Sequence, residues 1–395
     1  MTTMPDRQVG QSLHRVEAID ALRGFAALIV VIYHARGIFW VGCSETYHRY
    51  GFHPNFSALI GYISVPLSYG SLGVTLFFVL SGYCIHRQGA RKLAENRSTP
   101  FNFRAFVVRR FWRIYPTYVA ALLVTFLVDA AVATRMGDWD PHQDDSLYAF
   151  VMSLFTMQGY LAYYFGSNAV FWTLAMEVHL YLAYPLLFAL TRRFGPRATV
   201  LFTLVVALVY LAADTCFHIE QHLPYRFERG PIFLPYWFTW AAGFYVAEIE
   251  AGRVTDLSRW AWRVLMVMGL ATGLVLTNIG ANEAADIFWA LFFAGLLRWS
   301  LQPQGRLFWA GQFGLGLSFI GVFSYSLYAI HAPVLHLIHA LFVGPDDRKL
   351  ATIWPALGAT LVAIVVAWIF FQLVERWSLR RRPVVASMKG GPTHA

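Results

Sequence analysis

Apolar residues recur along the chain in runs long enough to cross a lipid bilayer. A transmembrane helix needs about 20 predominantly apolar residues, because each residue advances the helix by about 1.5 Å across a hydrocarbon core of about 30 Å. Polar stretches separate ten such runs, which predict an all-α polytopic membrane protein. The predicted helices span residues 19–40, 59–85, 105–132, 169–191, 198–214, 232–248, 261–279, 284–301, 319–343 and 352–375.

The ninth run is longer than one crossing requires. It extends from Phe313 to Val343, and Gly314, Gly316 and Gly321 lie near its beginning. Glycine is a weak helix former, so these positions indicate an interfacial segment that leads into the helix. The whole run is therefore counted as one crossing.

The composition agrees with a membrane protein and leaves no room for a large soluble domain. Apolar residues make up 57% of the 395 positions and charged residues only 13%, whereas a soluble domain has about 25% charged residues. We predict a cytoplasmic N-terminal segment at 1–18, a membrane domain at 19–376 and a basic cytoplasmic tail at 377–395. The odd cysteine count, three, argues against a disulfide framework.

The basic residues alternate between the two sides of the predicted helices. Cytoplasmic loops carry an excess of Lys and Arg, and most of the 31 basic residues fall in the N-terminal segment, every second loop and the tail. This split predicts that both termini are cytoplasmic, and it accounts for the net charge of +9 without a nucleic-acid partner. The polar start lacks a recognisable signal-peptide cleavage site, so the first helix should remain as an anchor.

Ionisable residues inside the apolar runs are the candidates for chemistry, because a charge at bilayer depth is costly and usually faces a cavity or a partner. Arg23 and His34 share one face of the first helix, about 16 Å apart along its axis. Taken alone, Arg23 is better interpreted as a snorkelling anchor paired with Asp20. For His34, a neutral histidine bonded to a neighbouring helix and a catalytic histidine are equally good interpretations.

Glu177 lies well inside the fourth predicted helix, where a lone carboxylate must be protonated or paired. Counted from the cytoplasmic ends of their helices, His34 and Glu177 lie about 20 Å deep and His331 about 17 Å deep. These depths predict one buried site, provided that the three helices are neighbours. In such a site Glu177 would orient an imidazole and raise its basicity for general-base catalysis.

Arginines crowd one face at the cytoplasmic start of the third helix, namely Arg109, Arg110 and Arg113. Such a cluster suits bidentate binding of phosphates, although on charge alone a basic helix flank is the favoured interpretation. Ser81 could donate a hydrogen bond to a substrate, but beside Gly82 its spacing favours close helix packing.

Five short motifs together resemble the acyltransferase 3 family of bacterial integral-membrane acyltransferases. They are Arg23 with His34, Phe77–Gly82, Arg110–Pro116, Trp172–Glu177 and Tyr325–His331. Each is weak alone, but all five occur in the family's order within a similarity that extends from Asp20 to Glu375. Thr75 and Thr173 stand where the family often has aspartate and serine. Trp377 replaces the proline of its closing Glu-x-Pro motif, so no role is assigned to Glu375.

The resemblance implies a multi-pass O-acyltransferase of the bacterial cytoplasmic membrane. Its donor would be a cytoplasmic acyl-CoA, most often acetyl-CoA, with no metal ion. Its acceptor would be a hydroxyl of a carbohydrate or glycoconjugate that is reached from the other side. The acceptor, the acyl chain and the oligomeric state, a homo-oligomer included, stay open.

Under this hypothesis the candidate residues fall into three groups. Arg23, Arg110 and Arg113 bind the phosphates of the donor. His34 acts as a general base or as a transient acyl carrier, assisted by Glu177. The oxyanion donors and supporting residues are then chosen from His331, Tyr328, Ser81, Asp20 and Trp172.

A transporter or flippase of polysaccharide or lipid-linked sugar is the alternative function, because it too can place His and Glu at the midplane. Transporters often contain inverted repeats with matched broken helices, and no such repeat is recognised here. Loops 41–58, 133–148 and 215–231 on the predicted outer side are the candidates for acceptor recognition. Their aromatic residues fit an interfacial belt equally well.

Overall fold

The computed structural model describes residues 4–40, 42–51, 56–136, 144–219, 232–344, 349 and 352–381. Within these ranges the chain forms helices and loops, which confirms the predicted all-α class. The helices are α1 (Met4–Phe39), α2 (Gly42–Tyr50), α3 (Phe56–Ile63), α4 (Leu72–Glu95), α5 (Phe103–Met136), α6 (Leu147–Leu154), α7 (Phe171–Phe194), α8 (Pro196–Phe217), α9 (Leu234–Glu250), α10 (Arg259–Asn278), α11 (Asn282–Ser300), α12 (Pro303–Trp309), α13 (Gln312–Val322), α14 (Ser324–Phe342), α15 (Trp354–Phe370) and α16 (Arg376–Arg380). Parts of the outer loops considered for acceptor recognition lie outside the described residues.

Two predicted helices are interrupted in the structure. The run at 59–85 is divided into α3, a 3-10 turn at Val65–Tyr69 and α4, because Pro66 in that turn lacks an amide hydrogen. The ninth run is divided into α13 and α14, which meet at Phe323, where the backbone leaves helical geometry (φ −113°, ψ 19°). The prediction of one helix is wrong for the run at 59–85. In the ninth run α13 takes the place of the predicted glycine-containing segment that leads into the helix, and the helix itself begins at Ser324 rather than at residue 319.

By length and apolar composition, seven helices of the described part of the chain can cross a membrane. They are α1 from Glu17 onward, α5, α7, α8, α10, α14 and α15 with its continuation. The pair α11 and α12 would make eight, although the two helices are bent by 87°. The protein is therefore a multi-pass membrane protein, and this test does not establish the predicted number of ten crossings.

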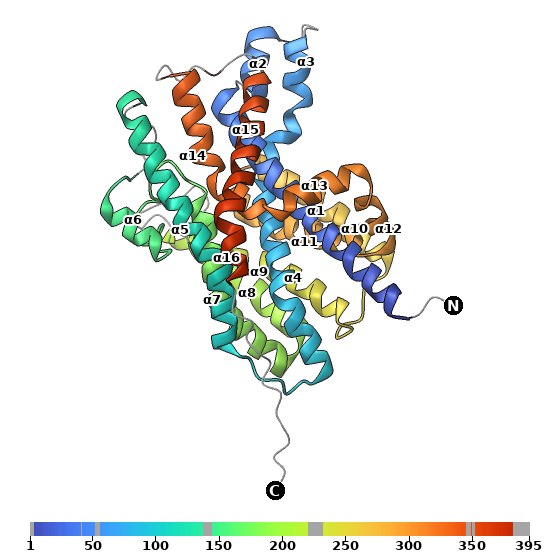
Figure 1. Ribbon diagram of the computed structural model, residues 1–395. Helices are drawn as coiled ribbons and strands as arrows, with labels where there is room; N and C mark the ends of the chain where they lie inside the picture. The colour runs from blue at the N-terminus through green and yellow to red at the C-terminus, as the bar shows by residue number, and fades with distance from the viewer. Residues whose placement is uncertain are drawn as a thin grey trace.

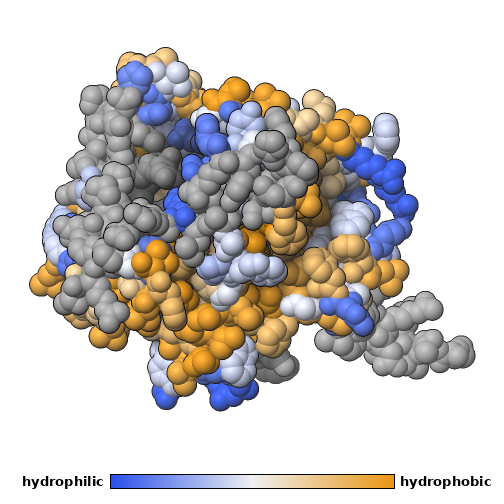
Figure 2. All heavy atoms as spheres, turned by 90° about the horizontal axis from the view of Figure 1, so that it is seen from above, coloured by the Kyte–Doolittle hydropathy of each residue, from blue (hydrophilic) through white to orange (hydrophobic). Residues whose placement is uncertain are grey.

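The candidate spans differ in how much of each is enclosed by the others. The most apolar windows of α14, α1 and α7 are 67%, 56% and 50% buried, whereas those of α8 and α10 are 17% buried. In Figure 1, α10 to α13 lie on one side and α5 and α6 on the other. Figure 2 shows hydrophobic side chains around much of the periphery. Outward apolar faces of this kind are suited to lipid. The candidate site residues His34, Glu177 and His331 lie on the three most enclosed helices.

Glycines bring several pairs of helices into backbone contact, most closely α1 with α13 and α4 with α9. A Cβ atom on Gly24 of α1 would lie 1.9 Å from the carbonyl oxygen of Leu317 in α13, and one on Gly321 would lie 1.9 Å from that of Asp20. Gly82 of α4 and Gly243 of α9 approach each other's helices in the same way, at 1.9 and 1.8 Å. Only residues without a side chain permit this approach, so each pair of helices has a fixed register.

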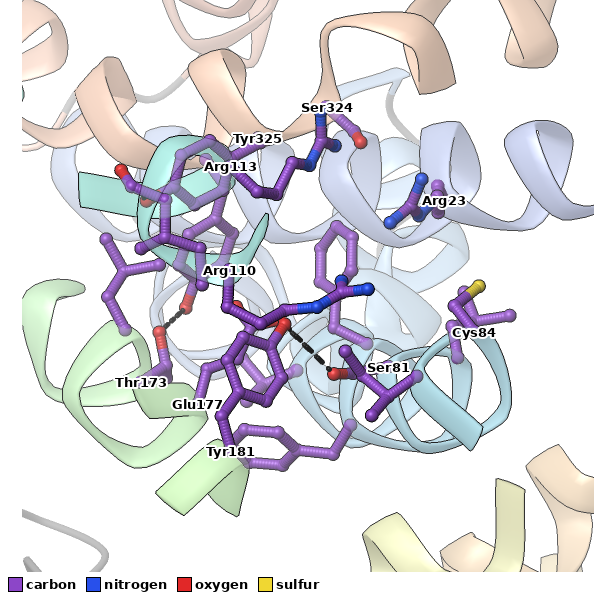
Figure 3. Close-up of a pocket in the computed structure, with 18 residues that line it drawn as sticks. Arg23, Ser81, Cys84, Arg110, Arg113, Thr173, Glu177, Tyr181, Ser324 and Tyr325 are labelled. Atoms are coloured by element: carbon purple, nitrogen blue, oxygen red, sulfur yellow. Dashed lines mark hydrogen bonds between the residues drawn. The ribbon is translucent and has the colours of Figure 1, made fainter. Parts of the chain in front are cut away.

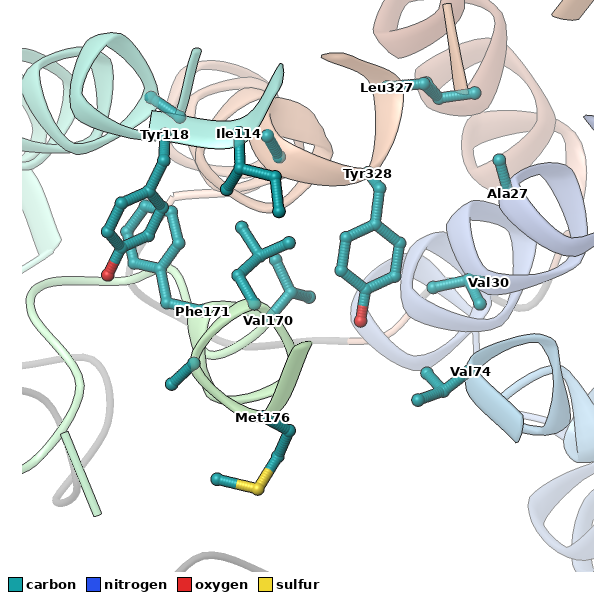
Figure 4. Close-up of a cluster of buried hydrophobic side chains, with 14 of the residues drawn as sticks. Ala27, Val30, Val74, Ile114, Tyr118, Val170, Phe171, Met176, Leu327 and Tyr328 are labelled. Atoms are coloured by element: carbon teal, nitrogen blue, oxygen red, sulfur yellow. The ribbon is translucent and has the colours of Figure 1, made fainter. Parts of the chain in front are cut away.

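Helices α1, α4, α5, α7 and α14 meet in an apolar cluster, shown in Figure 4. Val30 of α1, Val74 of α4, Ile114 of α5, Val170 just before α7 and Tyr328 of α14 all contribute to it. The apolar cluster therefore packs beside the predicted polar residues of these helices, of which Arg23, His34 and Glu177 are half-buried.

Candidate active site

A pocket lies between α1, α4, α5, α7 and α14 (Figure 3). Residues from all five sequence motifs line it. Its side chains with polar or sulfur groups are Arg23, Ser81, Cys84, Arg110, Arg113, Thr173, Glu177, Tyr181, Ser324, Tyr325 and Tyr328. Segments far apart in the sequence thus converge on one cavity, as expected if the motifs serve one site.

The three predicted phosphate-binding arginines all reach this pocket, but their partners differ. Arg113 Nη1 lies 2.9 Å from Oε1 of Glu375, and Arg23 Nη1 lies 3.9 Å from Oδ1 of Asp20. Asp20 thus has the supporting position that the sequence predicts.

Arg110 is the arginine available to an anionic ligand. Within the described part of the chain no carboxylate lies within ion-pair distance of it, and its buried Nε has no hydrogen-bond partner. Its guanidinium lies over the rings of Phe106 and Tyr181, 5.7 and 5.8 Å from their centroids. Figure 3 shows the guanidinium groups of Arg23 and Arg110 directed into the same space.

Glu177 faces this pocket and is paired with hydroxyl groups rather than with a histidine. Its Oε1 accepts hydrogen bonds from Tyr181 Oη and, at 3.2 Å, from Ser81 Oγ. The indole of Trp240 donates to Ser81 Oγ at 3.2 Å, so the serine is itself held in place. The serine–glutamate contact brings α4 and α7 together at the pocket wall.

The expectation that Glu177 orients an imidazole is corrected by this geometry. Within the described ranges no hydrogen bond joins Glu177 to His34 or His331, and neither histidine lines the pocket. The depth estimate assumed helices parallel to the membrane normal, but α1 runs obliquely through the fold (Figure 1). In tilted helices, equal residue counts do not give equal heights.

Of the three residues expected to share one site, His34 and His331 do lie side by side. His331 Nε2 is 3.1 Å from His34 Nδ1, and the ring centroids are 5.0 Å apart. His331 is fully buried. The two histidines therefore form a unit, termed the histidine pair below.

Hydrogen bonds to backbone carbonyls assign the tautomers of the histidine pair. His331 Nδ1 lies 2.8 Å from the carbonyl oxygen of Tyr328, and His34 Nδ1 lies 3.0 Å from that of Val30. Carbonyl oxygens only accept, so each Nδ1 carries a proton. In the neutral pair His331 Nε2 must then accept from His34, which leaves the lone pair of His34 on Nε2.

In this tautomer His331 has no N–H directed at the pocket. Its only N–H is directed at the carbonyl oxygens of Tyr328 and, at 3.2 Å, Leu327. His331 is instead placed to orient His34.

Tyr328 links the pocket to the histidine pair. It lines the pocket, its hydroxyl lies 2.7 Å from Thr173 Oγ1, and its ring centroid lies 5.7 Å from that of His331. Trp172, the other predicted supporting residue of this region, does not line the pocket; its ring lies 6.0 Å from that of Tyr236. Trp172 thus has a packing position.

Some site residues have no assigned role in the sequence interpretation. Tyr181 lies one turn after Glu177 on the same helix face, a spacing that could have indicated a partner. Glu375 is a fully buried acid in the last apolar run and contacts Arg113. Its burial in an apolar run was a signal, but its partner lies on α5, and no local pattern points to it.

Comparisons with known proteins agree with the geometry. A family model described as an acyltransferase domain matches residues 16–372. The chain belongs to the acyltransferase 3 family. The resemblance read from the five motifs is thereby confirmed, and the protein is a membrane acyltransferase.

Curated relatives share low but extensive similarity with this family member. It is 25% identical to the membrane-bound transacylase BcsY of Komagataeibacter xylinus, over 95% of this chain and 87% of BcsY. It is also 25% identical to the acyltransferase MdmB of Streptomyces mycarofaciens, over 97% of this chain and 96% of MdmB. With the O-acetyltransferase OatA of Staphylococcus aureus it shares 24% identity, over 82% of this chain and 51% of OatA. No solved structure matches.

Proposed function

We propose that the protein transfers an acyl group, most simply acetyl, from cytoplasmic acyl-CoA to a hydroxyl of a carbohydrate or glycoconjugate on the other side of the membrane. The observation that carries this proposal is the contact between His34 and His331, whose ring in turn contacts Tyr328 of the arginine-lined pocket. From the hydrogen bonds to backbone carbonyls we infer that Nε2 of His34 carries no proton and can react. The name of OatA, an O-acetyltransferase, agrees with a hydroxyl acceptor.

In the proposed topology the chain crosses the membrane ten times with both termini in the cytoplasm. Ten crossings result if α4, α9 and the bent α11–α12 pair join the seven candidate spans. The excess of Lys and Arg in alternate loops supports this sidedness. Arg110 and Arg113, near the beginning of α5, then lie toward the cytoplasmic side, where acyl-CoA is available.

The donor's phosphates bind to Arg110, with Arg113 and Arg23 beside it. Guanidinium groups form strong bidentate hydrogen bonds to phosphate oxygens, and Arg110 has no competing carboxylate among the described residues. The pantetheine arm has roughly a dozen bonds of about 1.3–1.5 Å, so it spans about 15 Å when extended. Arg23 and His34 are about 16 Å apart along α1, so the thioester would reach the histidine pair.

His34 Nε2 then performs one of two balanced reactions. As a general base it takes the proton of the acceptor hydroxyl while that oxygen attacks the thioester carbonyl; the carbon–sulfur bond breaks, and the CoA thiolate takes the proton from His34. As a nucleophile Nε2 attacks the thioester carbonyl, the carbon–sulfur bond breaks, and an acyl-imidazolium and the CoA thiolate form. The acceptor oxygen then attacks the acyl carbon, the bond from that carbon to Nε2 breaks, and the hydroxyl proton passes to the CoA thiolate. In both routes Nε2 of His331 accepts a hydrogen bond from the Nδ1–H of His34 and so holds the imidazole ring in place.

The hydroxyl of Tyr328 is the candidate to stabilise the oxyanion, because Tyr328 lines the pocket and its ring lies against that of His331. In dry surroundings one such hydrogen bond lowers the barrier by about 3 kcal/mol. Glu177 fixes Ser81 and Tyr181 and balances part of the arginine charge before the donor binds.

The test is acyl transfer by the purified protein. Labelled acetyl-CoA is incubated with a panel of glycan acceptors, and the wild type is compared with His34→Ala and with His179→Ala. His179 is a histidine of α7 outside the pocket lining and serves as the matched control. We expect transfer by the wild type and the control only.

Two outcomes would overturn the proposal. Unchanged transfer by His34→Ala would remove His34 from the reaction. No release of CoA with any acceptor would argue against acyl-CoA as the donor.

A further inference from the structure

Glu375 is a fully buried carboxylate that joins three helical segments beside the pocket. Its Oε1 pairs with Nη1 of Arg113 in α5 at 2.9 Å. Its Oε2 accepts from Oγ of Ser326 in α14 at 2.6 Å and from the amide of Ser326 at 3.2 Å. Both oxygens thus have partners, which a buried charge requires.

The position of Glu375 depends on an irregular turn. Residues Phe371–Glu375 between α15 and α16 form a π-helix. A π turn holds one more residue than an α turn, so it redirects the residues that follow, and such turns occur often at functional sites. Here the π turn ends at the residue that contacts both Arg113 and Ser326.

The break at Phe323 supplies the second half of the contact. The first amides of a helix have no partner within the helix, and a negative charge stabilises this end. Ser326 lies in the first turn of α14, so its amide is one of these groups, and Glu375 accepts from it. The carboxylate therefore caps α14, the helix that carries Tyr325, Tyr328 and His331.

The capped carboxylate also holds Arg113 at the pocket wall. The Arg113 side chain is 18% exposed whereas that of Glu375 is 0% exposed, so the pair has a buried end and an end that reaches the cavity. Only Nη1 of Arg113 is used by Glu375, and a guanidinium has five N–H donors. Donors therefore remain for a ligand, on a side chain whose freedom is already restricted.

We propose that Glu375 is a positioning residue for the acyl donor: it fixes the Arg113 guanidinium so that its remaining N–H groups meet the donor's phosphate. This inference rests on the proposed binding of acyl-CoA at the arginines. Glu375 touches neither the donor nor the reacting atoms, so it acts on donor affinity and leaves the chemical step alone.

The test compares Glu375→Gln with Arg113→Met and Asp256→Asn in the full-length protein. The glutamine can still accept from Ser326 but has no charge for Arg113. Asp256→Asn is the matched control, because Asp256 pairs with Arg298 away from the pocket lining. Thermal unfolding of each variant verifies folding, and kcat and KM for acetyl-CoA are measured.

For Glu375→Gln we expect a KM about tenfold higher, the effect of losing one charge-assisted hydrogen bond, with kcat within about twofold of the wild type. Arg113→Met should raise KM at least as much, and the double variant should match Arg113→Met alone, because coupled residues are not additive. The control should keep both parameters. If Glu375→Gln fails to fold, Glu375→Asp is measured in its place and the same rise in KM is required.

The failures of the two proposals can be told apart. If Arg113→Met and Arg110→Met both leave the KM for acetyl-CoA unchanged, the donor site of the proposed function is wrong. If the arginine variants raise KM but the Glu375 variant does not, or lowers only kcat, Glu375 is not a positioning residue and the donor site stands.

Discussion

The arginine pocket and the histidine pair are built on the same helices but have opposite electrostatic character. Helix α1 contributes Arg23 to the pocket and His34 to the pair, and α14 contributes Tyr325 and His331 in the same order. The pocket holds charged groups, with Arg110 available to an anion, whereas the pair contacts backbone carbonyls. A charged ligand group therefore fits the first region, and proton transfer by a neutral base fits the second.

The largest expected effect is that of His34→Ala on kcat. Removal of a general base costs roughly 10²- to 10⁴-fold in rate, while the KM for acetyl-CoA should hardly change because His34 is outside the pocket lining. Steady-state kinetics with labelled acetyl-CoA measure both parameters. A variant that lost donor affinity and kept its kcat would reverse the proposed division.

A smaller loss of kcat is expected for His331→Phe. The phenyl ring preserves the aromatic shape but cannot accept a hydrogen bond from the Nδ1–H of His34. The imidazole of His34 is therefore less well oriented. We expect kcat to fall by about 10²-fold, the low end of the contribution of a general base. His179→Phe, on α7 and outside the pocket lining, is the control. A loss as large as that of His34→Ala would indicate that His331 itself reacts.

Arg110→Met should affect the other region alone. Loss of a charge-assisted phosphate contact, worth about 1.5–3 kcal/mol, raises the KM for acetyl-CoA about 10- to 100-fold and spares kcat. Arg110→Lys keeps the charge but not the planar fork, so it should recover part of the affinity. Equal KM values for the methionine variant and the wild type would place the phosphates elsewhere.

The smallest effect concerns the Asp256–Arg298 pair, outside both regions. Burial raises the pKa of Asp256, but hydrogen bonds from Arg298 and Trp262 and the charge of Arg298 lower it more, so it lies below the ordinary value of 3.8. A carboxyl group whose pKa is lowered by folding stabilises the fold at pH values above its ordinary pKa. This stabilisation is lost as the pH falls through the lowered pKa.

Asp256→Asn should therefore reduce stability by at most about 1 kcal/mol at neutral pH, because the pair is partly exposed. The difference in Tm from the wild type should shrink below pH 3.8. Both regions should keep their kinetics. A difference in Tm that grew toward acidic pH would contradict the assigned direction of the pKa shift.

The sequence predicted the helices better than their interruptions. Runs of apolar residues locate long helices because burial and lipid contact both require them. The turn at Pro66 and the break at Phe323 are local features within apolar stretches. Their outcome depends on neighbouring helices, such as the carboxylate of Glu375 that caps α14.

The sequence predicted many of the residues at the site, but it predicted only some of the contacts between them. Arg23, Arg110 and Arg113 do reach one pocket, and His34 does meet His331. The partners of Glu177 and Glu375 depend on how tilted helices pack, and no sequence spacing reports this. The pair of Arg113 and Glu375 joins α5 to the end of α15, across most of the chain.

The glycine contacts between helices also constrain how the protein can move. Because Gly24 and Gly321 leave no gap between α1 and α13, neither helix can rotate about its axis without a collision of backbones. The same holds for α4 and α9 at Gly82 and Gly243. A Cβ atom on Gly73 of α4 would in turn lie 2.5 Å from the carbonyl oxygen of Ala26 in α1, so the two pairs are also in close contact with each other. The wall of the pocket between Arg23 and Ser81 is therefore built on four helices of fixed register, and changes in its shape fall to side-chain rotation.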